Sequence, residues 1–289
     1  MVGLQPSLCQ NAIMAPLALT AERRKQLVEW LDDPQRLRGE HPNVADYFRT
    51  ANGLPGTGDG QADAAFDLRL LHYMTAGESA SANPYWDIVA PSVSERDGRR
   101  VVDGGSPQGS GHLAFAEMTL QSAYAYAIPS PETISWVSRS CDGLPITEVG
   151  AGRGYWAAQL SRAGMSVEAF ELEPPDAIEN VSFPQSVGQT DVWHPVRGID
   201  ELDFGDRAED VLFLCWPPGW GSSMASDVLS AYESAGGRRL IYIGEPKGGK
   251  NGNDAFFDSL SAGWDLASVD ADFVSWWDLA DVAQCWIRR

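Results

Sequence analysis

The chain has 289 residues, of which 44% are hydrophobic, and its formal net charge is −19. This length allows one large α/β domain with an extension, and the hydrophobic content permits a packed core, which excludes disorder of the whole chain. The charge is uneven, since residues 141–289 hold 10 basic and 24 acidic residues. Such a field repels phosphate, so we expect neither nucleic acid nor an anionic membrane as a partner. A cationic or amine-bearing small molecule fits better, unless the charge serves solubility alone.

The four cysteines, Cys9, Cys141, Cys215 and Cys285, form no closely spaced pair, so no metal site is predicted. The apolar stretch at residues 12–19 lacks a basic flank and is a poor signal peptide. No apolar run approaches the roughly 20 residues that span a bilayer. We therefore expect a soluble, cytoplasmic protein, and a homo-oligomer or a small protein partner stays open.

In chain order, residues 1–19 have no clear period and are expected to be loosely ordered. Residues 20–140 predict a helical cap that shapes the substrate site, with helices expected over 20–31, 43–50, 62–75 and 113–127. The Gly- and Ser-rich segment 94–111 predicts a long flexible loop, and such loops are often lids. Pro131, directly after Ser130, marks the start of a further helix.

From residue 141 onward, short apolar runs alternate with helical stretches, which is typical of a parallel, doubly wound sheet. The runs at 211–216 and 240–244 are continuously apolar, as expected for central strands covered on both faces. Two last strands are expected at 264–269 and 282–287, the final one antiparallel. The predicted fold class is therefore α/β, with a Rossmann-like domain over residues 141–289.

A glycine loop, Gly150-Ala151-Gly152-Arg153-Gly154, follows the predicted strand 146–149 and opens a helix. A ligand can approach bare backbone at such a helix N-terminus. The third glycine stands one residue too early for the dinucleotide fingerprint, and no Lys-Ser/Thr pair follows, which excludes a phosphate-binding P-loop. Glu171 lies 21 residues beyond Gly150, where a carboxylate can accept hydrogen bonds from two ribose hydroxyls.

The pattern Glu148-x-Gly150-x-Gly152-x-Gly154, followed by Glu171, resembles the first two motifs of class I S-adenosylmethionine-dependent methyltransferases. The resemblance implies a Rossmann-like methyltransferase sheet and S-adenosylmethionine as the cofactor. It implies that the glycines pass along the amino-acid part and the ribose, that Glu171 holds the ribose, and that Glu148 lies near the ligand's amine. The family also places an acid after the third strand, near the adenine amine. Asp191 is the candidate for it, unless it is a solvated loop residue.

A second resemblance covers about residues 124–289. It links the chain to a little-characterised group of bacterial and fungal methyltransferase-like proteins through the segments Tyr126–Glu132, Gly154-Tyr155-Trp156, Trp193–Val196, Cys215–Pro218 and Tyr242–Glu245. This resemblance supports the fold strongly and a substrate hardly at all.

The predicted fourth strand ends at Cys215-Trp216-Pro217-Pro218-Gly219-Trp220, which superficially resembles the Asn/Asp-Pro-Pro-aromatic motif of amino-methyltransferases. In that motif the amide or carboxylate holds the target amine, whereas the indole of Trp216 cannot accept a strong hydrogen bond. We expect instead an aromatic, cation-binding wall for the substrate, unless several of its members are core residues: Tyr126, Tyr155, Trp156, Trp216 and Trp220.

Two residues are candidate catalytic proton acceptors. His194 is expected after the third strand, and Glu245 ends the fifth. Each has a plainer alternative, since a histidine in a loop is often a surface or capping residue and a glutamate at a strand end often caps a helix.

Three functional hypotheses follow from these patterns. The leading one is an S-adenosylmethionine-dependent methyltransferase of a small molecule, in secondary metabolism, that works mainly by aligning the nucleophile with the methyl group. The second keeps the fold without the cofactor and assigns an intramolecular ring closure of the aziridine type, in which an amine expels a sulfate- or phosphate-type leaving group. The third is a non-catalytic subunit that binds a partner protein through its acidic C-terminal half.

Overall fold

The computed structural model describes residues 17–175 and 182–289. Its centre is a seven-stranded sheet with the strand order β5-β4-β3-β6-β7-β10-β8. Neighbouring strands are parallel except at β10, which runs antiparallel to both β7 and β8. The strands are β3 (Ile146–Val149), β4 (Val167–Glu171), β5 (Val196–Gly198), β6 (Val211–Cys215), β7 (Arg239–Gly244), β8 (Trp264–Val269) and β10 (Val282–Arg288). This is the α/β, Rossmann-like methyltransferase sheet that the glycine motif predicts, with its last strand antiparallel as expected.

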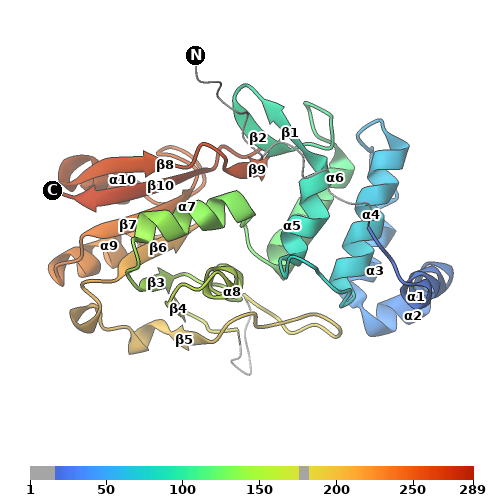
Figure 1. Cartoon of the computed structure of the whole chain (residues 1–289), viewed down its shortest axis with the longest axis horizontal. Helices are drawn as coiled ribbons and strands as arrows, with labels where there is room; N and C mark the ends of the chain where they lie inside the picture. Colours follow the sequence, from blue (N-terminus) through green and yellow to red (C-terminus); the bar gives the residue numbers. More distant parts are fainter. Residues whose placement is uncertain (1–16, 176–181) are drawn as a thin grey trace, which may run out of the picture.

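Helices cover both faces of this sheet, which explains why its central strands are continuously apolar (Figure 1). On one face, α7 (Pro131–Cys141) and α8 (Tyr155–Arg162) pack in a buried cluster with Phe213 and Ile241. On the other face, α9 (Met224–Ser234) and α10 (Asp254–Gly263) pack with Leu212 and Tyr242. Helix α7 therefore belongs to the sheet, although it precedes residue 141, where the predicted domain begins.

The cap is a group of helices beside the sheet, on the right of Figure 1. Its helices are α1 (Ala21–Asp32), α2 (Pro34–Glu40), α3 (Pro42–Ala51), α4 (Gly60–Met74), α5 (Pro84–Val89) and α6 (Gly111–Ala123). They share one apolar core, which also contains Tyr155 of α8 and Trp276 from the C-terminal half of the chain. Buried side chains therefore join the cap to the sheet.

The prediction of a long loop over residues 94–111 is wrong. Strands β1 (Val93–Arg96) and β2 (Arg99–Val102) form a hairpin there, and β9 (Val274–Trp276) pairs with β2 in parallel. The turn after the hairpin is held by the buried carboxylate of Asp103, which accepts hydrogen bonds from Ser94 Oγ (2.8 Å) and Arg96 Nε (2.6 Å). The polar residues of this segment thus order the turn, and the small sheet ties the cap to the C-terminal segment.

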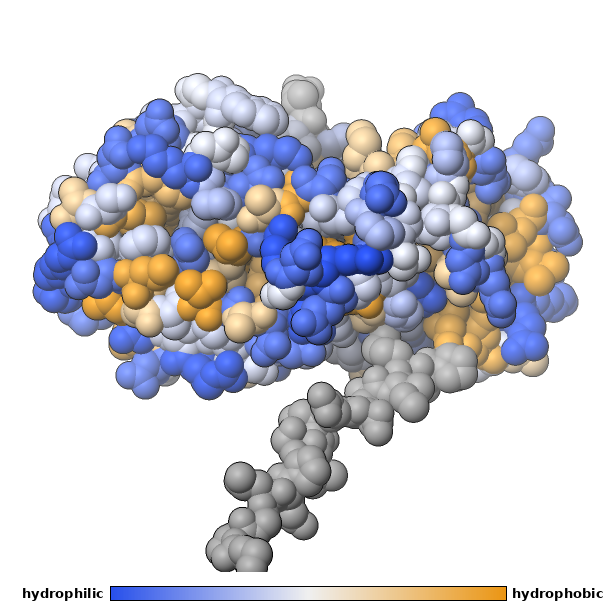
Figure 2. All heavy atoms as spheres, turned by 90° about the horizontal axis from the view of Figure 1, so that it is seen from above, coloured by the Kyte–Doolittle hydropathy of each residue, from blue (hydrophilic) through white to orange (hydrophobic). Residues whose placement is uncertain are grey.

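Figure 2 shows one face of the molecule, where hydrophobic residues lie in separate groups between hydrophilic ones. Scattered exposure of this kind is ordinary for a folded chain and marks no binding surface by itself. Within the described ranges, residues 17–175 and 182–289, no helix is both long enough and apolar enough to cross a membrane.

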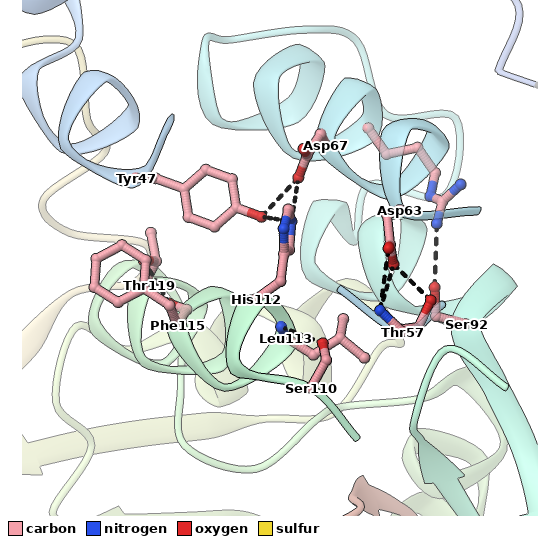
Figure 3. A network of polar contacts seen from close by, with 11 residues as sticks. Tyr47, Thr57, Asp63, Asp67, Ser92, Ser110, His112, Leu113, Phe115 and Thr119 are labelled. Atoms are coloured by element: carbon pink, nitrogen blue, oxygen red, sulfur yellow. Dashed lines mark hydrogen bonds and ion pairs between the residues drawn. The ribbon is translucent and has the colours of Figure 1, made fainter. Parts of the chain in front are cut away.

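A buried network of polar side chains holds three cap helices together (Figure 3). Nε2 of His112, at the start of α6, lies 2.8 Å from Asp67 Oδ1 of α4 and 2.9 Å from the Tyr47 hydroxyl of α3. The same Tyr47 hydroxyl donates a hydrogen bond to Asp67 (2.7 Å). The hydrogen bond with Asp67 raises the pKa of His112, because the carboxylate favours the charged imidazolium.

This raised pKa makes the stability of the cap depend on pH. The contribution of His112 is fully present below its unfolded pKa of about 6.5 and is lost as the pH rises through its higher folded pKa. We expect the free energy of unfolding of the wild-type protein to fall over this window, and that of His112→Gln to fall less. The variant is also expected to be about 1–3 kcal/mol less stable at pH 6, because Asp67 and Tyr47 lose a buried partner. Urea unfolding at closely spaced pH values measures both effects, and parallel pH profiles for the two proteins would contradict the assignment.

Candidate functional site

The glycine loop connects β3 to α8 and has a backbone that only glycine adopts easily. Gly150, Gly152 and Gly154 have φ values of 79°, 56° and 74°. A side chain at Gly154 would also meet the carbonyl oxygen of His194 at 2.9 Å and Val196 Cγ2 at 3.0 Å. The loop therefore packs as bare backbone against His194 and Val196, and no side chain fits at Gly154.

The close approach at Gly154 can be separated from its backbone strain by comparing two glycines. Gly164 also has a left-handed backbone, with φ of 89°, but an added Cβ atom would meet nothing within 4 Å. We expect Gly164→Ala to cost about 1 kcal/mol of unfolding free energy, from backbone strain alone. Gly154→Ala is expected to cost about 2–4 kcal/mol, because it adds a steric overlap to the strain. Chemical denaturation of both variants measures the difference, and equal losses would show that the loop is not tightly packed at Gly154.

Glu171 ends β4 and faces the glycine loop, as predicted from its spacing. Its Oε2 atom accepts a hydrogen bond from the Gly152 backbone N–H (2.9 Å), and its Oε1 atom accepts one from the Leu172 N–H (2.8 Å). The side chain is half-buried. Its carboxylate therefore lies directly against the loop.

Glu148 is a buried carboxyl at the end of β3, immediately before the loop. Burial raises the pKa of Glu148 to about 8, although a hydrogen bond with the Ala157 backbone opposes the shift, and the nearby charge of Glu171 adds to it. Its Oε2 atom has no hydrogen-bond partner in the parts of the chain that the structure describes. A buried polar atom in this state is unfavourable by about 1–3 kcal/mol. The amino group of S-adenosylmethionine would supply the missing donor, so the residues present fit this cofactor.

Asp191 and His194 do not follow the third strand, and that part of the prediction is wrong. The third strand is β5, Val196–Gly198, and both residues precede it. Asp191 lies against Arg153 of the glycine loop, with 3.5 Å between Oδ1 and Nη1, and also accepts a hydrogen bond from the Ser186 N–H (3.3 Å). Its surroundings make it a structural partner of the loop's arginine.

The imidazole of His194 interacts with the backbone of Val167, at the start of β4. Burial lowers the pKa of His194. Because the carboxyl ends of the parallel strands lie at the other edge of the sheet, the structure does not bring this imidazole together with Glu245.

Asp200 is the acid that follows the third strand in the structure, two residues after β5 ends at Gly198. Its carboxylate folds back toward the strand, since a side chain at Gly198 would collide with Asp200 Oδ1. The sequence signal for this residue was the three-residue run Val-Arg-Gly, which is too short to recognise as a strand by its periodicity.

Trp216 follows β6 in a left-handed backbone conformation, with φ of 53°. Its ring stacks on that of Tyr126, with 4.9 Å between centroids and 11° between planes. Its Nε1–H donates a hydrogen bond to Oδ2 of Asp281 (2.9 Å). The indole thus joins an exposed aromatic ring to a carboxylate from the loop before β10.

The other members of the predicted aromatic wall lie elsewhere. Tyr155 is buried, and its hydroxyl donates to Asn83 Oδ1 (2.8 Å) within the core that joins the cap to the sheet. Trp156 is buried as well, and its Nε1–H donates to the Ala127 carbonyl (3.1 Å). Trp220 is 85% exposed, with no place in the stack. Tyr155 and Trp156 lie in the first turn of α8, which packs against the cap on one side and the sheet on the other, so both are core residues. Of the predicted wall, only the stacked rings of Tyr126 and Trp216 remain.

Glu245 lies at the end of β7, as predicted, but both of its carboxylate oxygens hold backbone. Oε1 accepts a hydrogen bond from the Ala280 N–H (3.1 Å), and Oε2 accepts one from the Lys250 N–H (2.6 Å). Its own backbone N–H donates to Asn251 Oδ1 (2.8 Å). Glu245 therefore positions the two loops that flank β7 and β10.

Asp281, which the sequence analysis did not single out, is buried at this edge of the sheet, as Glu245 is. It is 3% exposed, and its Oδ1 atom has no hydrogen-bond partner among the described residues. Burial raises the pKa of Asp281 to about 7, although the hydrogen bond from Trp216 opposes the shift. Nothing in the local sequence marks it, because its partner Trp216 lies 65 residues away.

Glu117 of the cap brings another carboxyl to the same region. Burial raises the pKa of Glu117 on α6 to about 8, and the charge of Asp278 adds to this shift. Its Oε1 atom accepts a hydrogen bond from Gln121 Nε2 (2.8 Å). Acidic side chains from the cap, from β7 and from the segment before β10 thus converge near the carboxyl ends of β6 and β7.

Two further observations limit the chemistry of the site. Across residues 17–175 and 182–289, no group of three or more His, Cys, Asp and Glu side chains is placed to hold a metal ion. One cavity, of about 260 Å³, opens between the cap and residues 188–190 and is lined by Tyr124 and Trp193 among others. Neither Trp216 nor Asp281 lines this cavity. We therefore describe the site at the strand ends by the contacts between its side chains.

Comparison with known proteins yields similarity of fold only. No family model matches the chain, and no curated protein matches it. A magnesium protoporphyrin IX methyltransferase (ChlM) from Synechocystis, solved with bound S-adenosylmethionine, is 16% identical over 54% of this chain and 76% of that chain, with a TM-score of 0.36. The CcbJ methyltransferase from Streptomyces caelestis is 14% identical over 55% and 94% of the two chains, with a TM-score of 0.35.

A third solved structure matches over nearly the whole length. RosA from Streptomyces davawensis, an N,N-8-amino-8-demethyl-D-riboflavin dimethyltransferase, is 17% identical over 94% of this chain and 100% of that chain, with a TM-score of 0.34. At such values these likenesses decide nothing about activity. The strand order with its antiparallel β10, the glycine loop and the acid at the end of β4 give this chain the class I S-adenosylmethionine-dependent methyltransferase fold.

Proposed function

We propose that the protein is an S-adenosylmethionine-dependent methyltransferase that acts on a small molecule. The observation that carries the proposal is the buried Glu148 carboxyl, whose Oε2 atom faces no hydrogen-bond donor among the described residues and lies directly before the glycine loop. A protein gains nothing in stability from such a group, so its presence favours a ligand that brings a donor of its own.

Each part of the cofactor has a residue suited to it. Glu148 accepts a hydrogen bond from the amino group, the three glycines let the ligand approach the backbone, and Glu171 accepts from the ribose hydroxyls. Asp200, after β5, is the candidate acid for the adenine amine. When bound, S-adenosylmethionine supplies an electrophilic methyl group on a sulfonium centre.

The chain's own contribution to catalysis is mainly alignment. Holding an acceptor in line with the methyl group converts a bimolecular reaction into an effectively unimolecular one. The stack of Tyr126 on Trp216 provides a stiff surface for the acceptor, and Glu245 fixes the loops around it through their backbone N–H groups.

The experiment that tests the proposal is a calorimetric titration of the purified wild-type protein with S-adenosylmethionine and S-adenosylhomocysteine. We expect both to bind with dissociation constants of about 1–100 μM, which correspond to binding free energies of about −8 to −5 kcal/mol. NAD serves as the control, since the loop lacks the third glycine of the dinucleotide fingerprint. If neither S-adenosylmethionine nor S-adenosylhomocysteine binds, the proposal is rejected and cofactor-free ring closure is favoured.

A further inference from the structure

Asp281 combines burial with an unused oxygen. It lies between β9 and β10, is 3% exposed, and accepts a hydrogen bond at Oδ2 from Trp216 Nε1 (2.9 Å). Its Oδ1 atom has no hydrogen-bond partner among residues 17–175 and 182–289. A buried carboxylate with one unsatisfied oxygen is a position where a cationic donor is strongly favoured.

An aromatic surface adjoins this carboxylate. The ring of Tyr126 is 52% exposed and stacks on the indole of Trp216, whose N–H end bonds to Asp281. The indole of Trp216 therefore contacts the exposed ring of Tyr126 with its face and the buried carboxylate of Asp281 with its N–H group. Trp216 has a left-handed backbone, which is unfavourable for a non-glycine residue, and such strain is often kept at functional sites.

The charged groups around Asp281 leave its Oδ1 atom as the unused acceptor. The acids Glu117 and Glu245 lie nearby, but Glu117 accepts from Gln121, and both oxygens of Glu245 accept from backbone N–H groups. Lys250 and Arg99 are the basic neighbours. Arg99 Nη2 already donates to Ser275 Oγ and to the Leu279 carbonyl, each at 2.9 Å.

The thiol of Cys215 is a shared neighbour of Asp281 and Glu148. The thiol of Cys215, at the end of β6, is close enough to both Glu148 and Asp281 that each carboxyl raises its pKa, in addition to the larger effect of burial. Both the carboxyl assigned to the cofactor's amine and the carboxyl beside the aromatic stack therefore act on this thiol.

We propose that Asp281, together with the stacked rings of Tyr126 and Trp216, binds the ammonium group of an amine-bearing substrate. The Oδ1 atom forms the ion pair, and the aromatic faces attract the cation and its alkyl substituents. Trp216 occupies the place where amino-methyltransferases carry an Asn or Asp, and here the indole N–H presents a carboxylate from another segment instead. Amine binding is independent of the cofactor, whereas the role of the amine as substrate rests on the proposed function.

The test uses n-butylammonium as the probe and n-butanol as its neutral counterpart, with binding followed by saturation-transfer NMR on the full chain. We expect the wild type to bind n-butylammonium and to bind n-butanol at least about tenfold more weakly. Asp281→Asn keeps an acceptor for Trp216 and removes the charge, so the affinity for n-butylammonium falls by about tenfold or more. Tyr126→Leu, at an exposed position, weakens binding by about two- to fivefold.

The matched control is Asp270→Asn. Asp270 is also buried, at 7% exposure, and its Oδ2 atom also lacks a hydrogen-bond partner in the described part of the chain, but it lies before β9 and makes no hydrogen bond to Trp216. Its substitution leaves amine binding unchanged. Equal affinity of the wild type for the amine and the alcohol, or equal binding by wild type and Asp281→Asn, would overturn the proposal. If Asp281→Asn does not fold, full retention of amine binding by Tyr126→Leu would overturn it instead.

Titration of the same proteins with S-adenosylhomocysteine separates this proposal from the proposed function. We expect Asp281→Asn to bind it as the wild type does. If the wild type binds n-butylammonium through Asp281 but does not bind S-adenosylhomocysteine, the amine site is supported and the methyltransferase function is rejected. If the wild type binds S-adenosylhomocysteine but does not prefer the amine to the alcohol, the proposed function is supported and the amine site is rejected.

Discussion

Replacement of Glu148 by glutamine is expected to weaken S-adenosylmethionine binding by about 10- to 100-fold, since the amino group loses the carboxyl with which it would form a charge-assisted hydrogen bond, worth about 1.5–3 kcal/mol. The glutamine keeps the size of the side chain, so the glycine loop stays in place. The loss is therefore expected in affinity and not in the fold.

The same substitution has the opposite effect on the protein without ligand. Because the folded pKa of Glu148 is about 8, against an ordinary value of 4.5, the folded state binds more protons than the unfolded state between these values. Stability of the wild type therefore falls as the pH rises through this window. Glu148→Gln does not ionise and escapes the loss, so we expect it to be more stable than the wild type at pH 8, by about 1–3 kcal/mol.

Calorimetry and urea unfolding of the same samples measure the two effects. Glu209→Gln is the control, because it makes the same change of charge at an exposed residue before β6. It should alter neither quantity. A Glu148→Gln variant that loses stability at pH 8, or that binds the cofactor like the wild type, would contradict the role assigned to this carboxyl.

The second large effect is expected for Glu171→Ala. The variant loses the acceptor for two ribose hydroxyls and also the hydrogen bond from the Gly152 N–H, so affinity for S-adenosylmethionine is expected to fall by about 100-fold. Glu171→Gln keeps an acceptor oxygen at the same place and should lose about tenfold. The graded response distinguishes ribose binding from a purely structural contact.

Glu168→Ala is the matched control for this series. Glu168 lies on the same strand, β4, and its carboxylate pairs with Arg197 and Arg207. Its loss removes partly exposed ion pairs, which are worth about 0–1 kcal/mol, and leaves the glycine loop untouched. Cofactor affinity equal to that of the wild type in Glu171→Ala would show that the loop does not hold the ribose there.

The sheet could be predicted because its central strands are unambiguous. The runs at β6 and β7 are apolar at every position, as strands between two helical layers must be, and the glycine loop fixes the turn into α8. β5 could not be predicted, since three residues carry no period, and this error displaced Asp191 and His194 from the strand end where Asp200 lies. The segment 94–111 was misread because its glycines and charges serve a hairpin and a tight turn.

Site residues that lie close together in the sequence could be predicted, whereas contacts between distant segments could not. The positions of Glu148, Glu171 and the three glycines follow from spacing within one βαβ unit. Asp281 could not be predicted, because its contact with Trp216 joins segments 65 residues apart through the order of strands in the sheet. Tyr155 and Trp156 look like binding residues in the sequence, and only the packing of α8 shows that the cap buries Tyr155 and that the sheet and α7 bury Trp156.

The most direct test of the account is a crystal structure of the protein with S-adenosylhomocysteine. We predict that its amino group lies within hydrogen-bond distance of Glu148 Oε2, about 2.7–3.2 Å, and that the ribose hydroxyls lie against Glu171. The thioether sulfur should point toward Trp216 and Asp281. A ligand bound elsewhere, or with its amino group away from Glu148, would contradict the central claim that the loop and this buried carboxyl form the cofactor site.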